Sequence, residues 1–163
     1  MRSKFELVVF VFISLILSCD SNRIFDKYKS VSEAWQKAEI IEFDFSPLEM
    51  DKPYNLFINI RTNNDYKFNN LFLIAQIDFP NGKSIVDTLE YKMAKPNGEL
   101  LGTGFSDVKE SKLWYKENFT FNELGNYKIK FQHAMRENGR IDGIDNLTGV
   151  IDIGFRVEKM IYD

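Results

Sequence analysis

The chain has 163 residues, a formal net charge of −3, one cysteine and one histidine. A mildly acidic chain with no run of basic residues fits neither a nucleic-acid-binding protein nor one held electrostatically on an anionic membrane. A single cysteine excludes an internal disulfide, and zinc sites usually take several Cys or His ligands. We therefore expect one domain that is stabilised by its hydrophobic core, with no metal and no cofactor.

Residues 1–18 have the order of parts found in a secretory signal peptide. A short basic head is followed by an apolar run over residues 7–17. As a helix this run would span roughly 16 Å, against a hydrocarbon core of about 30 Å, so it is too short for a comfortable membrane span. It ends in Ile16-Leu17-Ser18-Cys19, which resembles a bacterial lipobox. We predict removal of residues 1–18 and membrane attachment through lipid on Cys19; the alternative is ordinary cleavage near Ser18, with Cys19 an incidental thiol.

Residues 19–37 are expected to form a lipidated tether and a first packed turn. Ser30 and Glu33 have the spacing of a helix capping box, but no sustained apolar period follows them. We therefore expect a loop or a single helical turn here, with Trp35 as a plug on the domain that follows.

From Ala38 to the end of the chain, apolar residues recur at every second position, which is the pattern of β-strands. Pro80-Asn81-Gly82 and Pro96-Asn97-Gly98 are turn-forming segments, because proline presets φ and Asn-Gly tolerates positive φ. Residues 71–79 are apolar on both sides and suit a central strand covered on both faces. Eight strands are expected, over residues 41–45, 56–61, 71–79, 85–91, 100–105, 113–121, 127–135 and 150–159.

No linker divides residues 38–163, and no long amphipathic helix is indicated. The expected fold class is all-β: a single antiparallel β-sandwich of about eight strands, immunoglobulin-like or jelly-roll, after the signal peptide and tether.

The sequence offers little chemistry for an active site. His133 lies on the apolar face of its strand and is expected to be buried and neutral, with its ring nitrogens satisfied. No Ser-His-Asp order, nucleophile elbow or Gly-rich phosphate loop is present. Residues 142–146 look faintly like a calcium loop but lack its alternating oxygen ligands and distant glutamate. We expect a protein that is not an enzyme and has no small-molecule substrate.

Seven short segments together carry a resemblance that covers nearly the whole chain after residue 18. They are Cys19–Arg23, Asn55–Arg61, Asn70–Leu73, Asp87–Tyr91, Ser111–Lys116, Ala134–Arg136 and Asp152–Arg156. As an ordered set they resemble the GldH family, the gliding-motility lipoproteins of the Bacteroidota. Many members of that family carry a tryptophan near the position of Leu100, so this chain departs from the pattern there.

The resemblance implies an envelope lipoprotein that serves as a non-enzymatic component of the gliding machinery. That machinery shares components with the phylum's protein-secretion apparatus. The expected partners are therefore proteins of the gliding machinery or of the secretion apparatus. The family brings no catalytic residues. The residues after Cys19 lack the acidic run that resembles a surface-export signal in this phylum. We therefore expect the protein to face the periplasm.

The segment Asp87-Thr88-Leu89 resembles the O-glycosylation acceptor used in this phylum. Thr88 is therefore a candidate modification site, and the alternative is a plain cross-strand threonine.

A candidate partner contact lies in residues 112–116. Strand alternation places Lys112, Trp114 and Lys116 on one face, opposite Leu113 and Tyr115. A large aromatic residue among lysines is typical of an interface hot spot. The alternative is that Trp114 lies under the lysine stems as a second small core.

Two rival functions remain open from the sequence. One is a glycan-binding β-sandwich lipoprotein in which Trp35, Trp114 and Tyr115 form a stacking platform. The other is a hydrolase, which the missing motifs argue against.

Overall fold

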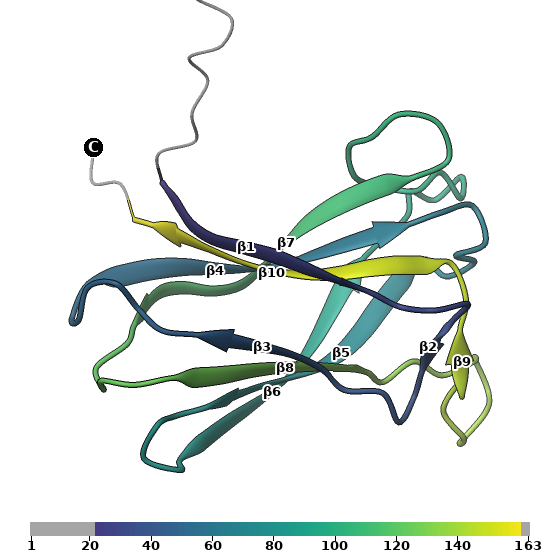
Figure 1. Ribbon diagram of the computed structural model, residues 1–163. Coiled ribbons are helices and arrows are strands. Elements are labelled where there is room, and N and C mark those ends of the chain that lie inside the picture. The colour runs from purple at the N-terminus through teal and green to yellow at the C-terminus, as the bar shows by residue number, and fades with distance from the viewer. Residues whose placement is uncertain (1–21, 161–163) are drawn as a thin grey trace, which may run out of the picture.

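The computed structural model describes residues 22–160, and this part of the chain forms ten strands and no helix. The strands lie in two four-stranded antiparallel sheets that face each other as a sandwich, as expected from the sequence (Figure 1). The first sheet has the order β1-β10-β4-β7, with β1 at Arg23–Ser30, β10 at Val150–Lys159, β4 at Pro53–Thr62 and β7 at Lys109–Thr120. The second has the order β3-β8-β5-β6, with β3 at Ile41–Phe45, β8 at Tyr127–His133, β5 at Asn70–Asp78 and β6 at Ser84–Lys92. A two-stranded ribbon pairs β2 (Trp35–Gln36) with β9 (Asn146–Leu147).

The core lies between the two sheets and is built from the side chains that point inward at alternate positions along each strand. Its centre is Phe155 of β10, which has no exposed surface. The Phe155 ring centroid lies 6.1 Å from that of Phe131 and 6.2 Å from those of Phe43 and Phe45, all on the second sheet. It lies 5.6 Å from that of Phe25 on β1. Aromatic rings at these separations pack favourably, so this cluster joins the two sheets.

The expected loop or helical turn before Trp35 is wrong over its first part, because Arg23–Ser30 is strand β1 at the edge of the first sheet. Its partner is β10 at the other end of the chain. The pairing contains a register shift between Arg23 and Phe25 and is regular from Phe25 to Ser30. Lys27 and Lys29 follow Phe25 on the same face of the strand, so no alternation of apolar residues marks it in the sequence. Trp35 itself is fully buried, as expected of a plug, and its indole N–H donates to the Glu39 carbonyl oxygen at 3.1 Å.

The strand expected at residues 100–105 is also absent from the structure. These residues belong to the long connection between β6 and β7, with only single bridges at Leu100 and Thr103. Gly102 and Gly104 have φ values of 109° and 156°. A Cβ atom would lie 2.5 Å from the Glu110 carbonyl oxygen at Gly102 and 2.2 Å from the Val108 carbonyl oxygen at Gly104. The two glycines therefore permit a close turn of the chain rather than a strand.

Strand β5 is central in the second sheet, but it is covered on one face only. Its residues alternate between buried and half-buried along its whole length. The outer face of β5 is not covered by a second layer, so Phe72, Ile74 and Gln76 keep part of their surface in solvent.

Candidate docking surface

The outer face of the first sheet carries a small aromatic patch formed by Trp114, Phe57 and Lys112. Trp114 of β7 and Phe57 of β4 are cross-strand partners, with ring centroids 4.4 Å apart and ring planes inclined by 49°. The Lys112 ammonium lies 4.0 Å from the Phe57 ring centroid. Phe57 is buried beneath these two side chains, whereas Trp114 is 53% exposed. We call these three residues the Trp114 patch.

The patch combines features of both interpretations of Trp114. A second small core does exist on this face, but the residue buried under the lysine stem is Phe57. The alternation of β4 predicts that Phe57 points away from the main core. The alternation does not indicate that side chains of the neighbouring strand would cover Phe57. Trp114 rests one side of its ring on Phe57 and leaves the rest in solvent.

Lys116 does not join the Trp114 patch. The register between β4 and β7 shifts around Leu56, and this irregularity redirects the end of β7. The Lys116 ammonium pairs with the Asp87 carboxylate of β6 at 2.9 Å. Tyr115, which is buried, donates its hydroxyl to the same carboxylate at 3.2 Å. Burial, together with Asp87, raises the pKa of Tyr115. Tyr115 and Lys116 thus link the edge strands of the two sheets.

Next to the patch, a polar network covers the middle of the first sheet. The Tyr28 ring lies over Gly154, where a Cβ atom would be 2.8 Å from a ring carbon. The Tyr28 hydroxyl accepts from Asn59 at 2.8 Å and donates to Glu110 at 3.1 Å, and the Arg61 guanidinium lies 4.1 Å from the Tyr28 ring centroid. Burial, followed by Asp26 and Glu110, raises the pKa of Tyr28 to about 12. Tyr28 therefore stays neutral and acts as a structural cover.

Ion pairs connect this network to the Trp114 patch. The Lys112 ammonium donates to Glu158 at 2.6 Å, and the Arg156 guanidinium binds both Glu158 and Asp26. Side chains from all four strands of the first sheet are thereby linked. The polar side chains around the patch already have hydrogen-bond or ion-pair partners. Few side chains would therefore have to lose conformational freedom if a protein bound there.

The aromatic platform expected for glycan binding does not form. Trp35 is fully buried and packs edge-on against His133, with ring centroids 5.4 Å apart. Tyr115 is buried at the β7–β6 seam. Of the three proposed platform residues, Trp114 alone presents its ring to solvent.

Thr88 lies on β6, the edge strand of the second sheet, and its side chain is exposed on the outer face. Its hydroxyl is thus open to a modifying enzyme. Glycosylation of Thr88 stays a prediction.

Comparison with known proteins now places the chain in a family. The sequence profile of the family described as GldH lipoprotein matches residues 23–157, which span both sheets. The chain belongs to the GldH lipoprotein family. It is 57% identical over 160 residues to the gliding motility lipoprotein GldH homolog of Christiangramia forsetii, and the match covers 98% of each chain. It is 50% identical over 159 residues to the gliding motility lipoprotein GldH of Flavobacterium johnsoniae, covering 98% of this chain and 99% of the relative.

Among solved structures, the similarities are weak. The dimeric latent PorU of Porphyromonas gingivalis matches with a TM-score of 0.37 and 9% identity, over 90% of this chain and 14% of that one. The VP2 subviral particle of infectious bursal disease virus matches with a TM-score of 0.34 and 16% identity, over 85% of this chain and 33% of that one.

In this member of the family, the fold brings together three of the segments that carry the family resemblance. Asn55–Arg61, Ser111–Lys116 and Asp152–Arg156 lie on the adjacent strands β4, β7 and β10. Their outward residues supply the whole Trp114 patch and part of the polar network. Cys19, the predicted lipidation site, lies outside the described residues.

No metal site or membrane-crossing helix is found in the part of the chain that the structure describes. Residues 22–160 contain no group of three or more His, Cys, Asp or Glu side chains that could hold a metal ion. Within the same range, no helix has the length and apolar character needed to span a bilayer.

His133 is buried as expected, but its ring nitrogens are not satisfied. Neither Nδ1 nor Nε2 has a hydrogen-bond partner among the described residues. Burial lowers the pKa of His133, and the nearby positive charge of Lys37 acts in the same direction, whereas the Trp35 backbone beside the ring acts in the opposite direction without fully offsetting them. The imidazole therefore stays neutral in the folded protein at neutral pH.

The burial of His133 predicts a loss of stability on mild acidification. The pKa in the unfolded chain is about 6.5 and the folded value is lower, so the unfolded state takes up the proton first. The free energy of unfolding should fall as pH drops below about 6.5, by at most about 1.4 kcal/mol at pH 5.5. Urea unfolding at pH 7.5 and 5.5 measures this change. In His133→Phe, which removes the chain's one histidine, the difference between the two pH values should vanish; an unchanged difference would assign it to other groups.

Proposed function

We propose that this protein is a non-enzymatic component of the gliding machinery, held in the cell envelope by lipid on Cys19. In this proposal it docks another protein of that machinery, or of the secretion apparatus linked to it, through the Trp114 patch. Membership of the GldH lipoprotein family supports the setting. The absence of an acidic run after Cys19 supports a periplasm-facing orientation.

The observation that carries the docking role is the geometry of Trp114. This large aromatic residue is 53% exposed on the outer face of the first sheet, and it packs on a buried phenylalanine beneath it. Tryptophan is among the residues most enriched at interface hot spots, especially where surrounding contacts are already ordered. Lys112 beside it is held by Glu158 and adds a polar rim.

The position of the one histidine supports a role without catalysis. His133 has almost no exposed surface, so it cannot exchange protons with a bound substrate. Trp35 covers it from the side of the ribbon β2–β9.

Trp114→Ala tests the docking role. Loss of this side chain should reduce co-purification of partner proteins and should reduce gliding, because a hot-spot truncation can cost about 2 kcal/mol or more of binding. The melting midpoint and cellular level should change little, since Trp114 is half in solvent. Affinity purification from detergent-solubilised membranes and motility assays measure both effects.

Two further variants separate docking from folding. Trp114→Lys keeps an aliphatic stem over Phe57 and should lose partners in the same way. Val86→Ala removes a similarly exposed apolar side chain from the outer face of the other sheet and should keep its partner proteins. If Trp114→Ala is instead depleted or strongly destabilised, the patch is chiefly a second core. Stable variants that keep their partners and their motility would exclude Trp114 as a docking residue.

A further inference from the structure

The point at which the chain enters the sandwich is fixed at one end of the two sheets. The Asn22 carbonyl oxygen accepts the N–H of Lys159, the last residue of β10, at 2.8 Å. The Lys159 ammonium in turn pairs with Glu49 of the β3–β4 loop at 2.5 Å. Figure 1 shows the start of β1, the end of β10 and the β3–β4 loop together at this end. We call it the tethered end.

Two of the exposed large apolar residues lie on loops at the tethered end. Leu48 in the β3–β4 loop is 73% exposed, and Leu124 in the β7–β8 loop is 82% exposed. The two loops are joined by a hydrogen bond from the Asp51 N–H to the Phe121 carbonyl oxygen at 3.4 Å. The leucines therefore project from one connected surface.

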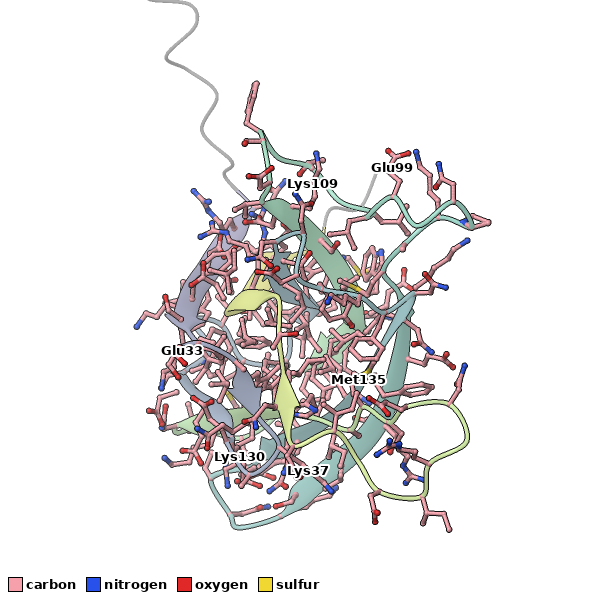
Figure 2. All side chains as sticks on the ribbon, turned by 90° about the vertical axis from the view of Figure 1, so that its right-hand side faces the viewer. Glu33, Lys37, Glu99, Lys109, Lys130 and Met135 are labelled. Atoms are coloured by element: carbon pink, nitrogen blue, oxygen red, sulfur yellow. The ribbon has the colours of Figure 1, made fainter. Side chains whose placement is uncertain are left out.

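The opposite end of the sandwich also exposes apolar residues, so exposure alone does not distinguish the two ends. Phe105, in the connection between β6 and β7, is 99% exposed, and Ile141, which follows β8, is 91% exposed. Figure 2 looks onto this opposite end, where Glu99 and Lys109 mark the connection that carries Phe105.

The two ends of the sandwich differ in how far they can lie from Cys19. Asn22 follows Cys19 by three residues, which span at most about 11 Å however they are arranged. Strand β10 alone has ten residues, and a strand of that length extends about 33 Å. Lipid on Cys19 would hold the tethered end within about 11 Å of the bilayer surface and would allow the opposite end to stand well away from it.

We infer that the tethered end faces the membrane and that Leu48 and Leu124 enter the interface of the bilayer that holds the Cys19 lipid. The inference rests on the lipid anchor of the proposed function. Apolar loop tips next to an acyl anchor gain by leaving water, and Glu49 already neutralises the charge of Lys159 beside them. The domain then stands upright, with Phe105 and Ile141 directed away from the lipid and the Trp114 patch on an upright side wall.

Four single-cysteine variants test this orientation. Cys19 is the one native cysteine, so when it is acylated any introduced thiol is unique. Leu48→Cys and Leu124→Cys report on the tethered end, and Phe105→Cys and Ile141→Cys are matched controls at the other. Each full-length lipidated variant is labelled with a nitroxide and reconstituted into vesicles of phosphatidylethanolamine and phosphatidylglycerol. All four sites are exposed, so labelling should not disturb folding.

Relaxation of the nitroxide by a water-soluble nickel chelate and by oxygen, which partitions into lipid, gives the result. At residues 48 and 124, access to nickel should be several-fold lower, and access to oxygen higher, than at residues 105 and 141. Flotation with the vesicles but equal access at all four sites would overturn the orientation and leave the anchor intact. Shielding at residues 105 and 141 instead would overturn it in favour of the opposite end. A chain that does not float at all would overturn the anchor and the orientation together.

Discussion

Truncating Phe155 to alanine should lower the free energy of unfolding by about 3–5 kcal/mol, a large part of the stability of a single domain. Phe155 has no exposed surface and packs against Phe25 on β1 and Phe131 on the opposite sheet. Removal of the Phe155 ring would leave a cavity between the two sheets. The surrounding side chains are held by both sheets, so they cannot all move in to fill it. Urea unfolding of residues 20–163, which lack the predicted signal peptide and the cysteine, measures the loss.

Val86→Ala is the matched control for this prediction. It also deletes apolar surface from a strand, but Val86 is 59% exposed on the outer face of the second sheet. Its cost should stay under about 1 kcal/mol. Equal costs at the two positions would contradict the placement of Phe155 at the centre of the core.

Replacing Cys19 with alanine should move the protein from the detergent phase to the aqueous phase in a phase-partitioning assay. The variant lacks the sulfur that accepts the lipid, and the acidic domain has no basic run with which to bind an anionic surface. Each buried methylene of an acyl chain contributes about 0.8 kcal/mol, and even one myristoyl chain gives only marginal binding. The two loop leucines carry far less apolar surface and should not replace the anchor.

Ser18→Ala is the control for the anchor. It keeps the cysteine and a small residue before the predicted cut, so the protein should still enter the detergent phase. If Cys19→Ala partitions with detergent like the unmodified sequence, lipid on Cys19 is not the anchor.

The fold class and most of the strands could be predicted from the sequence, because both follow from local rules. Period-two alternation marked six of the strands, among them β10 with Phe155 on its inward face, and a continuous apolar run marked β5. The two Pro-Asn-Gly turns were also readable, and Gly82 and Gly98 have the expected positive φ values of 88° and 84°. Seven short segments were sufficient to indicate the family, which the profile match to residues 23–157 confirms.

Features that depend on residues far apart in the chain could not be predicted from the sequence. Strand β1 exists because β10 supplies its hydrogen-bond partners, whereas its own sequence has lysines at positions 27 and 29 where apolar residues would have marked a strand. Phe57 is buried on the outer face because Trp114 and Lys112 cover it from the neighbouring strand. Lys116 turns to Asp87 because the register of β7 shifts. Alternation shows which way a side chain points, but its burial and its partners depend on the strand beside it and the layer above it.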